Sequence, residues 1–280
     1  MGVARLRDDK MKDLSKNVRK IPCTTAKSAG FHGKTETVAI MNLKDKLKVI
    51  RISCEAIGIW ETLKATLAYL LKYKPRNDRW FDRKFSTDTS SPISHEDLDI
   101  SDAEAKKSAT YYISSPVRFV RYIIDKLEID YREYDFVDIG CGKGRILMIA
   151  SDYPFRSISG IELSQALCMT AKKNLQIYRS PKQKCHNVQV HHMNATELPK
   201  SIENTVFYLY HPFEVQILTS VLNNVKSAFH NTDKMVWIIY IWSQVTSLSS
   251  LFEEFGFKRF RYEWTMNPRW QYTIFTLGQE

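Results

Sequence analysis

Three glycines stand at alternate positions in the segment FVDIGCGKGR, from Phe136 to Arg145, directly after a short apolar run. A turn formed by Gly140, Gly142 and Gly144 has no side chains to keep a ligand away from the backbone. The helix expected after it would point its first amide groups back over the turn. This pattern predicts a site for a cofactor that contains a nucleotide or nucleoside.

Two acidic residues narrow the chemistry of this cofactor. Asp138, just before the turn, would repel a pyrophosphate, whereas its carboxylate can accept hydrogen bonds from an ammonium group or a bound water. The pattern D-x-G-x-G-x-G also differs from the G-x-G-x-x-G of nicotinamide sites. Glu162 closes the next strand, twenty residues after Gly142, which is the spacing at which an acidic side chain meets both hydroxyls of a ribose. We therefore expect a cationic cofactor without phosphate.

Further candidate residues follow the third and fourth expected strands. Asn194 could accept a hydrogen bond from an adenine amino group while Met193 or Ala195 packs on the ring; a plain turn role for Asn194 is the alternative. The fourth strand ends in the sequence YHPF. It adjoins the first strand in such sheets, so we expect its last residues to line the reactive end of the cofactor: Tyr210, His211 and Phe213.

Strands and helices alternate from residue 135 onward. We expect strands near 135–139, 157–162, 187–192, 204–210, 234–241, 256–263 and 269–276, and helices near 143–152, 164–178, 213–229 and 245–255. The last two strands are joined only by a short turn at Asn267-Pro268, and such a short link forces an antiparallel pair. The predicted fold is α/β: a Rossmann-like seven-stranded mixed sheet, mostly parallel with the last strand antiparallel, helices on both faces, and an N-terminal helical extension.

The first part of the chain has a different character. Residues 1–42 show no apolar period and are expected to form a disordered basic arm. Residues 43–107 are expected to hold a long amphipathic helix, from Leu43 to Tyr73, and an aromatic collar over residues 76–100, which contains Trp80, Phe81 and Phe85. Residues 108–280 form the third predicted part, which begins with a helix near Pro116.

The positive charge is concentrated at the N-terminus. The net charge is +10; residues 1–85 hold 20 Lys and Arg against 9 Asp and Glu, whereas residues 86–280 hold 21 against 22. The first region thus has an excess of +11, which suggests an anionic partner such as nucleic acid or a membrane surface. A solvated helix face that packs on the rest of the protein explains the charge equally well. The apolar stretch over residues 49–73 is interrupted by charges, so no transmembrane segment is expected.

The five cysteines are odd in number and widely spaced. Free thiols in a reducing, cytoplasmic compartment are the simplest interpretation. Cys185, His186, His191 and His192 are the only cluster that suggests zinc, but the adjacent histidines would point to opposite sides of a strand. We expect no metal.

The segment 135–280 resembles the class I S-adenosylmethionine-dependent methyltransferases. DIGCGKG matches their cofactor loop, Glu162 their ribose-binding acid, NAT their adenine loop and YHPF their fourth-strand motif. With WFDRKFSTDTS and the SSPVRF helix upstream, the chain is similar to a largely uncharacterised bacterial-type branch of this family. The resemblance covers roughly residues 80–280.

The resemblance implies S-adenosylmethionine as the cofactor and a role for each matched residue. Gly140, Cys141 and Gly142 would lie against the methionine part, and Asp138 would hold its amino group. Glu162 would bind the ribose, and Asn194 and Ala195 the adenine. Amino-methylating members carry Asn or Asp before Pro where His211 stands, so His211 is interpreted as a general base or as a residue that orients the acceptor.

Methyl transfer from a sulfonium is an in-line displacement, for which the protein supplies proximity, alignment and proton removal. We expect the acceptor to enter between residues 211–213 and the collar, with Tyr112 or Tyr210 shaping the methyl pocket. Two other functions remain open. One is a protein that binds S-adenosylmethionine without turnover and docks on nucleic acid or membrane through its basic arm. The other, an NAD-dependent oxidoreductase, is disfavoured by Asp138.

Overall fold

The computed structural model describes residues 25–26, 38–39, 59–60, 63, 67, 78–91, 93, 98–100, 112, 114–198, 203–210, 215–242, 248–263 and 271–278. Contacts divide the chain into two compact units, Met1–Leu71 and Lys72–Glu280. The collar belongs to the second unit; the predicted boundary at residues 107 and 108 lies outside the described residues and stays a prediction.

The first unit contains a short antiparallel pair, β1 (Thr25–Ala26) and β2 (Val38–Ala39). Four residues of the predicted amphipathic helix are helical, and their large apolar side chains are exposed: Ile59, Trp60, Leu63 and Leu67. The rest of the predicted basic arm and most of the predicted helix lie outside the described residues. Within the described part of the chain, no helix is long and apolar enough to cross a membrane.

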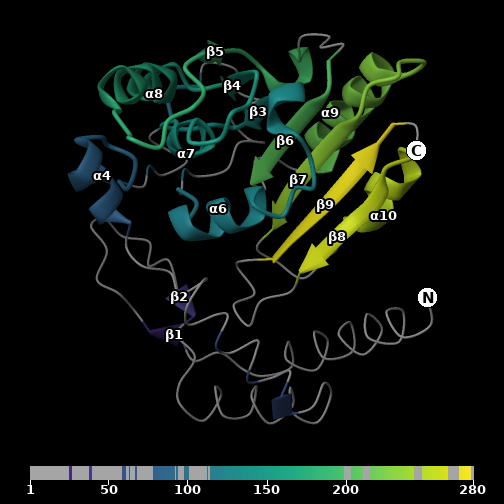
Figure 1. Cartoon of the computed structure of the whole chain (residues 1–280), viewed down its shortest axis with the longest axis horizontal. Helices are drawn as coiled ribbons and strands as arrows, with labels where there is room; N and C mark the ends of the chain where they lie inside the picture. The colour runs from purple at the N-terminus through teal and green to yellow at the C-terminus, as the bar shows by residue number, and fades with distance from the viewer. Residues whose placement is uncertain are drawn as a thin grey trace. The chain divides into compact units, whose positions relative to one another are not determined.

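The second unit is built on a seven-stranded sheet in the order β5-β4-β3-β6-β7-β9-β8 (Figure 1). Its first five strands along the chain pair in parallel, and β9 pairs antiparallel with both β7 and β8. The strands are β3 (Asp135–Ile139), β4 (Ser157–Glu162), β5 (Val188–His192), β6 (Thr205–Tyr210), β7 (Val236–Trp242), β8 (Lys258–Glu263) and β9 (Gln271–Leu277). The predicted mixed sheet with an antiparallel last strand is confirmed.

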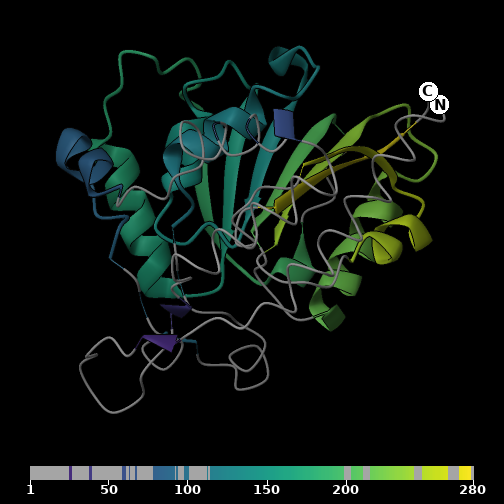
Figure 2. The same cartoon turned by 90° about the horizontal axis from the view of Figure 1, so that it is seen from below.

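Helices cover both sides of this sheet (Figure 2). They are α4 (Arg79–Phe85), α6 (Val117–Ile124), α7 (Arg145–Ala150), α8 (Gln165–Ile177), α9 (Val215–Phe229) and α10 (Ser249–Glu254), with the 3-10 turns η2 (Tyr131–Glu133) and η3 (Ala195–Glu197). The apolar side chains of α9 and α10 share one core with alternate residues of β6 and β7, such as Phe207 and Ile238. Phe119 of α6 contacts Tyr272 of β9 edge to face, with ring centroids 5.9 Å apart.

Burial along the strands follows their place in the sheet. Every residue of β6 except the last is buried, because β6 lies inside the sheet between covered faces, whereas β5 at one edge exposes three of its five residues. The chain proceeds from β3 outward through β4 to β5 and then crosses back to β6 on the other side of β3. This reversal places the carboxyl end of β3 at a topological switch point, where ligands bind in open α/β sheets.

The element boundaries agree with the sequence pattern to within a few residues. One difference near the site concerns α7, which begins at Arg145 rather than at residue 143. Gly144 has a φ of 81°, and this left-handed conformation keeps the turn open for two residues beyond the predicted start. The Asn267-Pro268 turn and residues 243–247, where α10 was expected to begin, lie outside the described residues.

The first part of the collar is ordered by its aromatic residues. Phe81 of α4 is fully buried, and the rings of Phe81 and Phe85 pack on Tyr178 at the end of α8, at 6.0 and 4.7 Å between centroids. Asp78 accepts a hydrogen bond of 2.8 Å from the amide of Val117, the first residue of α6. These contacts fix α4 next to the helices that flank the glycine turn.

Candidate cofactor site

The glycine turn after β3 has the open backbone that its sequence predicts. Gly140, Gly142 and Gly144 all have positive φ, at 81°, 52° and 81°, a region in which residues with a side chain are strained. The amides of Gly140 and Cys141 both donate to the carbonyl of Ile161, at 2.8 and 3.0 Å. The turn is therefore tied to the end of β4 as well as to β3.

Asp138 lies beneath this turn with an unsatisfied oxygen. The residue is 2% exposed, and its Oδ2 has no hydrogen-bond partner among the described residues. Burial, and then the nearby Glu162 carboxylate, raise the pKa of Asp138 well above that of a free carboxyl group. A buried, unpaired acceptor beside a second carboxylate is a site for a positively charged donor, as the ammonium group of an amino acid would be.

Glu162 braces the turn from the neighbouring strand. Its Oε2 accepts from the amide of Gly142 at 2.8 Å, and its Oε1 accepts from the amides of Leu163 and Ser164, each at 2.9 Å. Burial raises the pKa of Glu162, and these three amide hydrogen bonds partly offset that effect. A carboxylate has about four acceptor positions, so Glu162 can still accept from a ligand. Its predicted contact with a ribose stays a prediction.

Asn194 and Ala195 lie where the third strand of the parallel set ends. The side-chain oxygen of Asn194 accepts from the amide and the hydroxyl of Thr196, both at 3.0 Å, and so caps η3. Ala195 is 8% exposed and belongs to the core that α9 covers. The plain turn role of Asn194 is thus present in the structure, and the adenine contact of both residues stays a prediction.

Tyr112 covers the middle of the glycine turn. A Cβ atom placed on Gly142 would lie 2.2 Å from the Cε2 of Tyr112, so the ring fits only because position 142 has no side chain. The hydroxyl of Tyr112 donates to the carbonyl of Thr89 at 2.8 Å, and the Lys143 ammonium lies 5.7 Å from the ring centroid. The Tyr112 ring therefore lies over Gly142 while its hydroxyl binds the collar, and its predicted role in shaping the methyl pocket stays a prediction.

The predicted catalytic end of the site is only partly described. Tyr210 is the last residue of β6 and is half-buried. His211 and Phe213 lie outside the described residues. Cys141, predicted to lie against the cofactor, is free and 4% exposed, and burial raises the pKa of its thiol. Cys141 therefore contributes its backbone rather than a thiolate to the turn.

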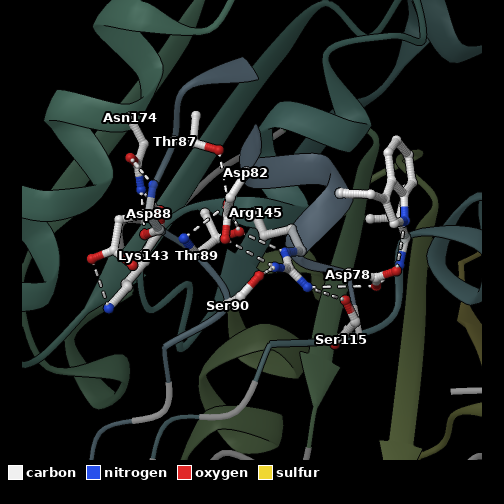
Figure 3. A network of polar contacts seen from close by, with 12 residues as sticks. Asp78, Asp82, Thr87, Asp88, Thr89, Ser90, Ser115, Lys143, Arg145 and Asn174 are labelled. Atoms are coloured by element: carbon white, nitrogen blue, oxygen red, sulfur yellow. Dashed lines mark hydrogen bonds and ion pairs between the residues drawn. The ribbon is translucent and has the colours of Figure 1, made fainter. Parts of the chain in front are cut away.

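Sequence reasoning missed a polar network that joins the collar to the glycine turn (Figure 3). Arg145, the first residue of α7, is 3% exposed and lies among side chains of residues 78–90. Lys143 forms an ion pair with Asp88 at 3.0 Å. The signal for this network was present, since the collar segment DRKFSTDTS is rich in hydroxyl and acidic groups.

Metal ligands do not converge in the described part of the chain, where no group of three or more His, Cys, Asp or Glu side chains could hold an ion. His191 and His192 are both exposed on β5, and Cys185 is buried. The Nε2 of His192 lies 2.9 Å from the carbonyl of Leu163.

Comparison with known proteins gives a family for the first part of the sheet. Residues 132–210 match a family model described as "Putative methyltransferase". This segment runs from η2 to the end of β6 and contains the glycine turn, Asp138 and Glu162. None of the curated proteins matches the chain in sequence.

Many solved structures are similar to the chain at low sequence identity. A ribosomal protein L11 methylase from Lactobacillus delbrueckii subsp. bulgaricus is 14% identical with a TM-score of 0.44, over 58% of this chain and 78% of that one. A putative S-adenosylmethionine-dependent methyltransferase from Listeria monocytogenes is 12% identical with a TM-score of 0.43, over 59% and 98%. An RNA methyltransferase from Salinibacter ruber, in complex with S-adenosyl-L-homocysteine, is 15% identical with a TM-score of 0.41, over 60% and 95%.

The strand order, the glycine turn at the switch point and the paired acidic residues all agree with the family match. The Oδ2 of Asp138 has no hydrogen-bond partner in the described part of the chain, where a cationic group is expected, and the backbone of the turn is left-handed at all three glycines. The match shows a putative methyltransferase family over residues 132–210, and this agrees with the expected resemblance to the class I S-adenosylmethionine-dependent methyltransferases and with S-adenosylmethionine as the cofactor.

Proposed function

We propose that the protein transfers a methyl group from S-adenosylmethionine to an acceptor by in-line displacement. The observation that carries this proposal is the buried Oδ2 of Asp138, which lacks a partner among the described residues and lies next to the glycine turn. The ammonium group of the methionine part is a donor that would satisfy this oxygen, and a pyrophosphate would be repelled by it. The same observation argues against an NAD-dependent oxidoreductase.

The roles of the other residues follow from their places around the turn. Gly140, Cys141 and Gly142 would contact the methionine part through their backbone, and Glu162 would accept from the ribose hydroxyls. Asn194 and Ala195 would lie against the adenine. Tyr112 covers Gly142, so its ring would confine the cofactor on the collar side.

In the reaction, a lone pair of the acceptor forms a bond to the methyl carbon while the carbon–sulfur bond breaks, and S-adenosylhomocysteine leaves. The acceptor's proton passes to a base. We place the acceptor between residues 211–213 and the collar, with His211 as the base or the orienting group, Tyr210 beside it and Phe213 as an apolar wall. Excluding water and aligning the two reactants are the main contributions of such a site.

Two measurements test this proposal together. Calorimetry with S-adenosylmethionine and S-adenosylhomocysteine measures binding, and transfer of a tritiated methyl group to components of a cell extract measures turnover. We expect both to be positive, and His211→Ala to reduce transfer while binding persists. Binding without any labelled product would favour a non-catalytic S-adenosylmethionine-binding protein. Binding of NADH without binding of S-adenosylmethionine would exclude the proposal.

The acceptor belongs to one of three classes: protein, nucleic acid or small molecule. The excess charge of +11 over residues 1–85 favours an anionic partner for that region. Identifying the labelled species in the extract distinguishes the three classes. Binding of the full chain to heparin or to anionic vesicles at several salt concentrations tests the charged region separately, since a purely electrostatic contact weakens steeply with salt.

A further inference from the structure

Arg145 is a buried cation whose polar contacts all reach away from its own helix. Its Nε donates to the hydroxyl of Thr89 at 2.7 Å, and its Nη2 donates to the hydroxyl of Ser90 at 2.7 Å. Its Nη1 donates to the carbonyl of Ser115 at 3.4 Å and lies 3.5 Å from a carboxylate oxygen of Asp78. A guanidinium removed from water needs such a complete set of partners, and residues 78–90 of the collar supply most of it.

Asp82 organises the part of the collar that Arg145 contacts. One of its oxygens accepts from the hydroxyl of Thr87 at 2.8 Å and from the amide and hydroxyl of Thr89 at 3.0 and 2.6 Å. Its other oxygen lies 3.7 Å from the guanidinium of Arg145. Burial alone would raise the pKa of Asp82, but the hydrogen bonds that it accepts lower it. Asp82 therefore stays ionised and fixes the loop that faces Arg145.

Further contacts connect the same loop to the glycine turn (Figure 3). The Lys143 ammonium pairs with Asp88 at 3.0 Å. Asn174 of α8 accepts from the amide of Asp88 at 3.0 Å, and its side-chain amide donates to the carbonyls of Asp88 and Lys143, both at 2.9 Å. Since Tyr112 also bonds to Thr89 while its ring covers Gly142, the collar contacts the turn on several sides.

We propose that Arg145 is a positioning residue for the cofactor, which clamps residues 78–90 of the collar against the glycine turn. This inference rests on the proposed binding of S-adenosylmethionine. The collar then forms a wall of the cofactor site. The glycine turn, Tyr112 and the Asp88–Lys143 pair keep their positions only while Arg145 holds its contacts with residues 78–90, which is the closed state of the clamp. A cofactor bound over the turn and the closed collar then stabilise each other, because each favours the same arrangement.

The test compares two variants that remove a guanidinium from an ion pair near α7. Arg145→Met opens the clamp at the start of α7. Arg121→Met removes the partner of Asp152, which follows the end of α7 and lies away from the turn. Binding of S-adenosylhomocysteine is measured by calorimetry at a temperature at which both variants are folded. We expect the Kd of Arg145→Met to rise by about tenfold or more, and that of Arg121→Met to stay within about twofold of wild type.

Limited proteolysis provides a readout that a general loss of stability would not reproduce. Arg83 and Lys84 are exposed on α4 and are sites for trypsin. We expect S-adenosylhomocysteine to slow cleavage there in the wild type, and Arg145→Met to speed it and to lose the protection by the ligand. Arg121→Met should keep that protection.

A second variant covers the case in which Arg145→Met does not fold. Asp88 is more than half exposed in its pair with Lys143, at 58%, so Asp88→Asn weakens the clamp with little effect on the fold. Its control is Glu203→Gln, a partly exposed partner of Arg156. We expect weaker binding and faster cleavage for Asp88→Asn than for Glu203→Gln.

The possible failures can be told apart. If wild type binds S-adenosylhomocysteine and a folded Arg145→Met variant binds it equally well, the clamp has no role in binding and the inference is wrong. The same holds if Arg145→Met is unfolded and Asp88→Asn binds like the wild type. If the wild type itself does not bind the ligand, the proposed function fails, and the inference falls with it.

Discussion

Replacing Asp138 by Asn tests the electrostatics of the cofactor site most directly. Burial and the neighbouring Glu162 carboxylate raise the pKa of Asp138. The Asp138 carboxyl group therefore binds its proton more tightly in the folded, ligand-free protein than in the unfolded chain. The contribution of Asp138 to stability is therefore complete below the pKa of the unfolded chain and is lost as the pH rises through the raised pKa. In Asp138→Asn this loss disappears, and we expect a ligand-free protein whose stability falls less between acidic and alkaline pH.

The affinity for the ligand should depend on pH in the opposite sense, rising with pH where the stability of the ligand-free protein falls. An ammonium group next to Asp138 favours the ionised carboxylate, so the affinity of the wild type for S-adenosylhomocysteine should rise with pH over the range in which Asp138 loses its proton. Binding near the raised pKa should also release a proton. Asp138→Asn removes a hydrogen bond between two charged groups, which contributes about 1.5–3 kcal/mol to the binding free energy. The Kd of the variant should therefore be about 10- to 150-fold higher than that of the wild type.

The assay is calorimetry with S-adenosylhomocysteine from pH 5 to 9, in pairs of buffers with different ionisation enthalpies, beside thermal unfolding of the ligand-free proteins. Asp135→Asn is the matched control, because Asp135 lies at the other end of β3 and pairs with Arg156 at 2.6 Å. It should leave the affinity unchanged. Wild-type affinity in Asp138→Asn would refute the assignment of Asp138 to a cationic group.

Two further substitutions test the turn itself. Gly142→Ala places a Cβ at a φ of 52° and 2.2 Å from the Tyr112 ring, so strain and overpacking should lower the free energy of unfolding by about 2–5 kcal/mol in chemical denaturation. Adding Tyr112→Ala should relieve the overpacking and leave the backbone strain; no relief would mean that the ring does not lie over the turn. In the wild type, three backbone amides donate to the two carboxylate oxygens of Glu162. Glu162→Gln replaces one of these oxygens by an NH₂ group, which is itself a donor, and should lower the free energy of unfolding by about 1.5–3 kcal/mol. Unchanged stability in denaturant would show that Glu162 does not brace the turn.

Much of the fold could be predicted from local patterns. The apolar run of β6, the alternation of strands with amphipathic helices and the glycines after β3 each depend on residues close in sequence, and their structure followed the prediction. Asp138 and Glu162 were found for the same reason, because each lies at or next to the end of a strand at a fixed distance from the turn.

The collar network could not be predicted in the same way. Arg145 and its partner Asp82 are far apart in the sequence, and either residue alone looks like an ordinary surface charge. Contacts between residues far apart in the sequence, such as the packing of α4 against Tyr178, bring residues 78–90 to the start of α7. The role of Asn194 could not be predicted from the sequence either. A side-chain oxygen at this position can cap the local turn or contact a ligand, and both roles require the same residue type.

The hydrogen bond between Glu162 and the Gly142 amide has a consequence for engineering. The same carboxylate that is proposed to recognise the ribose also holds the chain in its turn, so the choice of cofactor and the integrity of the scaffold cannot be altered separately. A redesign toward a phosphate-bearing nucleotide, which would begin by removing the acidic groups near the turn, would first have to supply another acceptor for that amide. Cofactor preference in this protein is thus protected against gradual change, because the first step away from it weakens the fold.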